Sequence, residues 1–281
     1  MEAQTETWTV GEFHFTVDTA GPASAPPVLL LHGFPETRRM WRYQLRGLAA
    51  AGFRGVAPDQ RGYSPGARPT SVESYASDRL TADALALMDR CGAPRFHLVG
   101  HDWGGQLAWL LAAAHPDRVA TLTALSRPHP AAFARAMAED PEQAGRSRHH
   151  AAFRQPDAVE RLRQEDFKLL RAGLEREGIA RADLETYFQT LSEPGALEAA
   201  INWYRASNIA FAEIPLVSVP TLYIWGTADA TVGRRAAELT EQFVSGPYRF
   251  VPIEGGGHFI VDQFPERIAE LLIAHLRSTS L

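Results

Sequence analysis

The chain has 281 residues, of which 45% are hydrophobic and 22% are charged, and this is the composition of a globular protein with one or two domains. A net charge of −5 provides no positive surface field, so nucleic acids and anionic membranes are not expected as partners. Cys91 is the only cysteine, no apolar run reaches the ~20 residues that span a bilayer, and the first residues lack the pattern of an export signal. We therefore expect a cytoplasmic protein without an internal disulfide.

Short apolar runs alternate with helical patterns along most of the chain. Alternation of this kind is typical of a mainly parallel sheet with helices on both faces. The pattern predicts an antiparallel hairpin over Thr7–Val17, followed by strands at Val28–His32, Arg54–Ala57, Phe96–Gly100, Val119–Leu125, Thr221–Trp225 and Tyr248–Pro252. The predicted fold class is α/β.

The alternation is interrupted after the predicted strand that ends at Leu125. From residue 128 to residue 211 the β-branched runs disappear, and the sequence becomes helical in pattern and rich in Arg, Glu and Ala. We therefore expect a helical domain at 128–212, inserted into a core that consists of 1–127 and 213–281.

Ionisable residues follow several of the predicted strands. Ligands of open α/β sheets bind outside the carboxyl ends of the strands, so these positions are the candidate site. The segments concerned are His32-Gly-Phe-Pro35, Gly100-His-Asp-Trp-Gly104, Gly226-Thr-Ala-Asp229 and Gly255-Gly-Gly-His258. We expect two acids and a histidine, Asp102, Asp229 and His258, to converge on one edge of the sheet.

The segment Gly100-x-Asp102-x-Gly104 has the form of a nucleophile elbow, a tight turn from strand to helix that projects its central residue. The alternative is that Asp102 only caps the helix that follows it. The order nucleophile, acid, histidine along the chain favours a catalytic role.

These motifs resemble the α/β-hydrolase superfamily, and within it the epoxide hydrolases and haloalkane dehalogenases, whose nucleophile is an aspartate. The resemblance covers nearly the whole chain. Two motifs, His32-Gly-Phe-Pro35 and Asn202-Trp-Tyr-Arg205, point to epoxide hydrolases in particular. The resemblance implies a fold with a helical cap, a small epoxide and water as substrates, and no cofactor.

An aspartate at the elbow suits attack on saturated carbon. A serine would form an ether there, whereas an aspartate forms an ester whose carbonyl accepts water in a second step. His258 would be the general base for that water, and Asp229 would orient it. The other place where this superfamily houses the acid offers only Ser126 and Arg127.

The resemblance implies further roles around the nucleophile. The backbone N–H groups of Phe34 and Trp103 would form the oxyanion hole, and the Phe34–Pro35 bond would be cis. Pro35 and Trp203 are expected at the substrate pocket, as is His32, although His32 has the alternative role of binding the backbone of its own loop.

Epoxide opening also needs a donor to the ring oxygen, and the family commonly supplies two tyrosines from the cap. Tyr204 matches one of them, and it shares a helix face with Leu197 and Ile201, so packing in the cap core is the alternative. The second tyrosine is missing, and His149 falls at its place. His149 could donate an imidazole N–H or could be an exposed basic residue, and His150 is the neighbouring candidate.

Two other functions stay open at this point. A haloalkane or haloacid dehalogenase would use the same nucleophile, although Phe34 stands where its asparagine is expected, and Trp103 and Gln106 stand where arginines would bind a haloacid carboxylate. A non-catalytic receptor on the same scaffold is the other possibility. No spacing indicates a metal site, and a homodimer is compatible with the sequence without being indicated by it.

Overall fold

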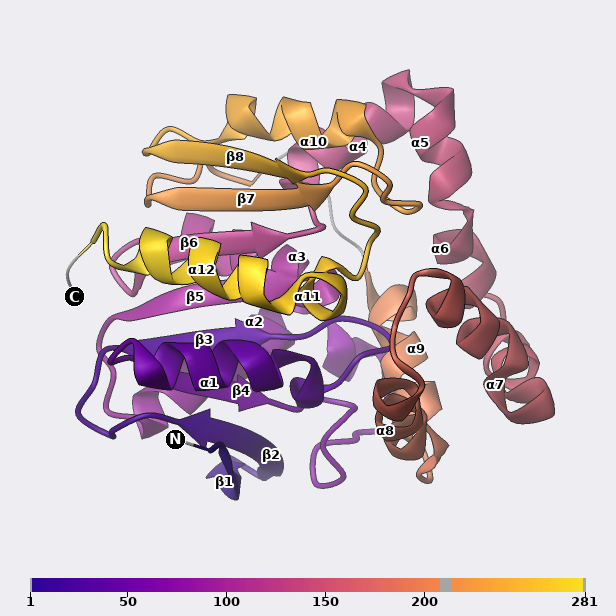
Figure 1. Cartoon of the computed structure of the whole chain (residues 1–281). Coiled ribbons are helices and arrows are strands. Elements are labelled where there is room, and N and C mark those ends of the chain that lie inside the picture. Colours follow the sequence, from indigo (N-terminus) through magenta and orange to yellow (C-terminus); the bar gives the residue numbers. More distant parts are fainter. Residues whose placement is uncertain (1, 208–213, 280–281) are drawn as a thin grey trace.

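The computed structural model describes residues 2–207 and 214–279. Within these residues an eight-stranded sheet forms the centre of the molecule, in the order β1-β2-β4-β3-β5-β6-β7-β8 (Figure 1). The strands are β1 (Gln4–Val10), β2 (Phe13–Ala20), β3 (Pro27–Leu31), β4 (Arg54–Pro58), β5 (Phe96–His101), β6 (Val119–Leu125), β7 (Thr221–Gly226) and β8 (Tyr248–Ile253). The predicted α/β class is confirmed.

Strands β3 to β8 run parallel, and the pairs β1–β2 and β2–β4 are antiparallel. Because Leu31 pairs with Gly100 and His101 pairs with Leu125, these three strands end at one edge of the sheet. The hairpin is longer than predicted, since β2 continues to Ala20 where its last residues pair with β4. The sequence pattern of β2 does not reveal that its last residues pair with a distant strand, so this extension was not predicted.

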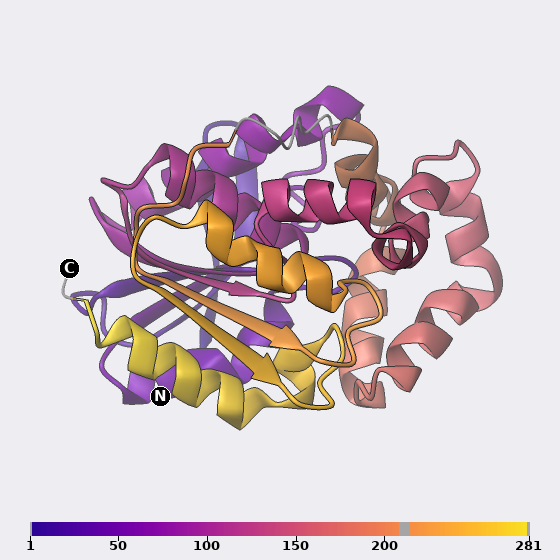
Figure 2. The ribbon, with the colours of Figure 1, turned by 90° about the horizontal axis from the view of Figure 1, so that it is seen from above.

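Helices cover both faces of the sheet. In Figures 1 and 2, α1 and α12 lie on one face, and α2, α3 and α10 lie on the other. Central strands β3, β5, β6 and β7 are therefore almost entirely buried. The core helices are α1 (Arg42–Ala50), α2 (Ser77–Arg90), α3 (Trp103–Ala114), α10 (Arg234–Leu239), α11 (Ile260–Gln263) and α12 (Pro265–Leu276), with 3₁₀ turns at Arg38–Trp41, Val72–Tyr75 and Thr240–Phe243.

The connection from β6 to β7 contains six further helices among the described residues. They are α4 (Pro130–Glu139), α5 (Pro141–Arg146), α6 (Arg148–Phe153), α7 (Ala158–Arg176), α8 (Arg181–Ser192) and α9 (Ala196–Ala206). Figure 1 shows α5 to α9 beyond the carboxyl ends of the parallel strands. The expected domain boundary at 212 and 213 lies outside the described residues. No helix that the structure describes is both long and apolar enough to cross a bilayer.

Candidate active site

Asp102 occupies a sharp turn between β5 and α3. Its backbone has φ 49° and ψ −118°, and residues other than glycine rarely adopt a positive φ. A Cβ atom on Gly100 would collide with the backbone of Gly104, and one on Gly104 would collide with the backbone of Leu31. The two glycines therefore permit the close approach that projects Asp102 from the sheet. The Asp102 side chain makes no capping hydrogen bond to α3, so the helix-cap alternative is not supported.

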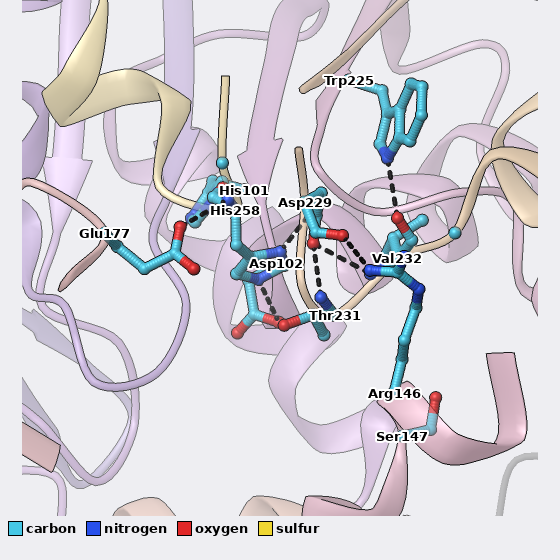
Figure 3. A network of polar contacts seen from close by, with 12 residues as sticks. His101, Asp102, Arg146, Ser147, Glu177, Trp225, Asp229, Thr231, Val232 and His258 are labelled. Carbon is cyan, nitrogen blue, oxygen red and sulfur yellow. Dashed lines mark hydrogen bonds and ion pairs between the residues drawn. The ribbon is translucent and has the colours of Figure 1, made fainter. Parts of the chain in front are cut away.

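The structure brings Asp102, His258 and Asp229 together (Figure 3). Nδ1 of His258 donates to Oδ2 of Asp229 at 2.9 Å, and Nε2 lies 3.5 Å from Oδ2 of Asp102. The other oxygen of Asp229 accepts the backbone N–H groups of Thr231 at 2.7 Å and Val232 at 2.8 Å. All three side chains are buried. The hydrogen bond to Asp229 fixes the imidazole so that Nε2 faces Asp102.

The protonation states of the site follow from this geometry. Burial by itself would lower the pKa of His258, but the charge of Asp229, the hydrogen bond to Asp229 and the charge of Asp102 raise it well above its usual value. Burial would raise the pKa of Asp102, but the His258 imidazole at 3.5 Å lowers it below its ordinary range. Both shifts favour a protonated His258 beside an ionised Asp102.

The loop after β3 contacts Asp102 from the other side. The backbone N–H of Phe34 donates to Oδ1 of Asp102 at 3.0 Å, and the Phe34–Pro35 bond is cis, as expected. Gly33 is needed here, because a Cβ atom on it would collide with the Asp102 carboxylate. Trp103, whose backbone N–H was the other expected donor, is the first residue of α3.

A cavity of about 490 Å³ lies over this site, within the size range of small-molecule pockets. Most of the residues that line the cavity near Asp102 are apolar, and the lining also includes Glu177 and two arginines. The cavity is lined by Phe34, Pro35, Asp102, Arg146, His149, Phe153, Leu170, Gly173, Leu174, Arg176, Glu177, Tyr204, Ala230, Thr231, His258 and Phe259. Of the three residues expected at the substrate pocket, the structure therefore brings only Pro35 to the cavity.

His32 and Trp203 serve the scaffold instead. His32 is fully buried, its Nδ1 donates to the carbonyl of Gly33 at 3.0 Å, and its Nε2 accepts the N–H of Gln60 at 3.1 Å. Burial lowers its pKa to about 4, which matches a neutral ring. Trp203 donates its indole N–H to the carbonyl of Arg61 at 2.9 Å. Both side chains therefore form hydrogen bonds to the backbone of core loops.

Tyr204 lies on α9 at the centre of an aromatic group near Asp102. Its ring packs edge-on against Trp103 and Phe153, at 4.9 Å between centroids in each case, and against Phe34 at 5.7 Å. Burial and the charge of Asp102 raise the pKa of the Tyr204 phenol well above its usual value. The phenol is therefore a proton-bearing group close to the carboxylate.

The two histidines of α6 point to different places. His149 is half-buried and lines the cavity, whereas His150 packs among Trp103, Phe133 and Tyr204 and does not line it. Burial lowers the pKa of both rings, that of His150 to about 2. Nδ1 of His149 donates to the carbonyl of Arg146 at 3.2 Å. In the neutral ring this bond leaves Nε2 without a proton.

Sequence reasoning missed two carboxylates behind His258: Glu36, which contacts His101, and Glu177, which binds His258 directly. Nδ1 of His101 lies 2.7 Å from Oε2 of Glu36, both side chains are fully buried, and Nε2 of His101 donates to the His258 carbonyl at 2.8 Å. Burial would lower the pKa of His101, but the charge of Glu36 raises it. Glu177 accepts the N–H of His258 at 3.1 Å. Among the described residues no group of ligands suits a metal ion.

The fold and the site now define the class of protein. A family model for the alpha/beta hydrolase fold matches residues 26–265, and the chain belongs to this family. Within it, the chain groups with the epoxide hydrolases. Epoxide hydrolase 4 of Mus musculus is 37% identical in an alignment 279 residues long, which covers 94% of this chain and 76% of that protein. Epoxide hydrolase A of Mycobacterium tuberculosis is 34% identical and covers 93% of this chain and 94% of its own.

Solved structures agree with this grouping. A structure described as one of the novel epoxide hydrolases from metagenomes of hot environments has a TM-score of 0.87 and 28% identity, and covers 98% of this chain and 99% of its own. An epoxide hydrolase from Vigna radiata has a TM-score of 0.85 and 26% identity, with 99% of each chain covered. The resemblance drawn from the motifs is confirmed.

Proposed function

We propose that this protein hydrolyses epoxides to vicinal diols through a covalent ester on Asp102, with the α4–α9 segment acting as a cap over the site. The observation that carries the proposal is the placement of Asp102 at the elbow, with Nε2 of His258 at 3.5 Å and Tyr204 lining the same cavity. The largely apolar lining near the nucleophile suits alkyl or aryl epoxides.

In the first step Asp102 attacks a ring carbon of the epoxide. Oδ1 is already bound to the Phe34 N–H, so Oδ2 is the attacking atom and Oδ1 becomes the carbonyl oxygen of the ester. The carbon–oxygen bond of the ring breaks, and its electron pair stays on the ring oxygen. The Tyr204 hydroxyl donates a proton to this oxygen as the alkoxide forms.

In the second step water hydrolyses the ester. Alkylation removes the charge of Asp102, which is one of the two charges that raise the pKa of His258. The imidazolium therefore releases a proton more readily, through solvent or to re-form the Tyr204 phenol, and its Nε2 becomes a base. Nε2 then takes a proton from the water that attacks the ester carbonyl. The Phe34 N–H stabilises the negative charge that builds on Oδ1. The intermediate then collapses, the bond between the carbonyl carbon and Oδ2 breaks, and the His258 imidazolium gives its proton to the former Oδ2. The diol departs with that oxygen atom, and the carboxyl group of Asp102 is restored.

His149 is the proposed second donor to the ring oxygen. Because its Nδ1 proton is bound to the Arg146 carbonyl, the ring donates from Nε2 only as an imidazolium or after a change of tautomer. The charge of Asp102 favours the imidazolium, although burial has the larger effect and lowers the pKa. The contribution of His149 should therefore be greatest at acidic pH.

Two observations speak for epoxides over halogenated substrates. The Phe34 ring lines the cavity where a dehalogenase would place an asparagine. Gln106 is fully buried and accepts the Nε–H of Arg127 at 2.9 Å, so it does not reach a substrate carboxylate. A complete set of Asp102, His258 and Asp229 beside this cavity also disfavours a receptor without turnover.

A single turnover in oxygen-18 water tests the covalent route. With enzyme in excess over styrene oxide, the oxygen added to the diol comes from Asp102, so the diol should carry no label and Asp102 should gain it. Direct attack of water on the epoxide would label the diol in the first turnover, and that result would reject the ester mechanism.

A further inference from the structure

The loop that carries His258 has little conformational restraint of its own. Three glycines, Gly255, Gly256 and Gly257, precede the histidine, and Gly255 adopts φ +70°. Glycine admits a wider range of backbone conformations than any other residue. The direction of the imidazole therefore depends on the groups that bind the backbone of this loop.

Both backbone polar groups of His258 are bound by side chains from elsewhere in the chain. His101, in the core, donates to the His258 carbonyl at 2.8 Å. Glu177, which follows α7 in the cap, accepts the His258 N–H at 3.1 Å with its Oε2 (Figure 3). The histidine is thus held between a core residue and a cap residue.

Gln263 strengthens the contact with the cap. Its Oε1 accepts the N–H of Gly257 at 2.8 Å, and its Nε2 donates to the backbone carbonyl of Glu177. A Cβ atom on Gly257 would collide with the Glu177 carboxylate, so the two segments meet without a gap. Glu177 is bound to the histidine loop directly and through Gln263.

The acid of the triad is held by the cap in the same way. Arg146 of α5 donates to the Asp229 carbonyl at 2.5 Å, and Gln143 accepts the N–H of Gly233 at 2.8 Å and donates to the Thr231 carbonyl at 2.9 Å. Two separate cap elements therefore bind the two loops that carry Asp229 and His258.

We propose that the cap positions the catalytic base, with Glu177 as the positioning residue for His258. This inference rests on the proposed two-step function. Alkylation uses Asp102 and the proton donors of the cap, whereas ester hydrolysis requires His258 to face the attacking water. Loss of the Glu177 carboxylate should therefore slow hydrolysis of the ester and leave its formation nearly unchanged.

The test compares Glu177→Ala and Glu177→Gln with a matched control, Glu175→Ala. Glu175 lies in the last turn of α7, and its exposed side chain makes no polar contact in the described part of the chain. Rapid quenching with styrene oxide, followed by intact-mass measurement, gives the rates of ester formation and decay separately. We expect Glu177→Ala to slow decay about tenfold, the rate equivalent of one hydrogen bond, with formation little changed. Glutamine keeps an acceptor for the His258 N–H, so Glu177→Gln should restore most of the decay rate.

A second variant approaches the same contact from the other side. Gly257→Ala places a methyl group against the Glu177 carboxylate, and it should slow ester decay as Glu177→Ala does. Because both changes break one contact, the double variant should be no slower than the slower single variant.

Three results would overturn the inference: ester decay in Glu177→Ala as fast as in the Glu175→Ala control, equal slowing of formation and decay, or no recovery in Glu177→Gln. Each of them presupposes that an ester forms. If no ester is detected even in His258→Gln with this epoxide, the proposed function has failed, and this outcome is distinct from the other three.

Discussion

Nε2 of His258 lies 3.5 Å from Oδ2 of Asp102, too far for a strong hydrogen bond and close enough for an ion pair. This arrangement favours a protonated His258 beside an ionised Asp102, the proposed nucleophile. Once Asp102 is esterified its charge is gone, and the same nitrogen faces the ester with a weaker hold on its proton. In the proposed mechanism, one histidine thereby stabilises the carboxylate of Asp102 before the first step and serves as base in the second.

Asp229→Asn should abolish turnover by preventing this change of role. The asparagine carbonyl would take over the N–H groups of Thr231 and Val232, which turns its NH₂ group toward Nδ1 of His258 and selects the wrong tautomer. We expect kcat to fall on the order of 10⁴-fold, as for the equivalent change in a serine hydrolase triad. Rapid-quench mass analysis should find the ester accumulating. A variant that retains more than a tenth of the wild-type kcat would reject this role for Asp229.

Tyr204→Phe should slow the first step. The ring packing against Trp103 and Phe153 is kept, so stability should change little, whereas the proton donor to the ring oxygen is lost. General-acid catalysis contributes about 10²-fold or more, and we expect a loss near that lower limit because His149 lies at the same cavity. The measurement is the rate of ester formation in a His258→Gln background. An unchanged rate would remove Tyr204 from the chemistry.

His149→Phe and His150→Phe form a matched pair, since both replace an imidazole by a ring on the same helix. His149 lines the cavity and His150 does not, so only His149→Phe should slow ester formation, by about tenfold, the rate equivalent of one hydrogen bond. The difference should grow toward acidic pH, where the His149 ring is protonated. If His150→Phe is the slower variant, the second donor has been assigned to the wrong histidine.

His129→Asn should reduce the loss of stability in acid. Burial lowers the pKa of His129 to about 4, so the unfolded chain takes up a proton near pH 6.5 that the folded chain does not. Folding is therefore disfavoured as the pH falls from about 6.5 toward 4, by about 2 kcal/mol at pH 5 from this group. Asparagine retains the acceptor for the Ala131 N–H.

Urea unfolding at pH 7 and pH 5 measures this effect. The free energy of unfolding should fall less between the two pH values in His129→Asn than in the wild type. His14→Asn, which changes an exposed histidine, is the control and should behave like the wild type. Identical pH dependence in all three proteins would show that His129 is protonated in the folded state.

Much of the fold and the centre of the site were predictable from local patterns. The strand Val119–Leu125 was predicted with its observed bounds, and the parallel strands that precede Asp102, Asp229 and His258 were found to within a residue or two. Buried strands and glycine-flanked turns are encoded by neighbouring residues. The convergence of these three residues then followed from the parallel order of the strands.

Contacts between distant segments were not predictable in this way. Glu177 and His258 are far apart in the chain, and the glutamate lies in an ordinary charged helical pattern that gives no sign of its hydrogen bond. The orientation of His32 depends on Gln60, which belongs to a different loop. The choice between His149 and His150 required knowledge of how α6 is turned against α9.

The central claim is the ester on Asp102, and the most direct measurement is the intact mass of His258→Gln after exposure to styrene oxide and, separately, to an alkyl bromide. Removal of the base should trap the first intermediate. The account predicts an adduct with the full mass of the epoxide, absent from the variant that also carries Asp102→Asn. An adduct formed only from the bromide, or one that persists in the Asp102→Asn variant, would contradict it.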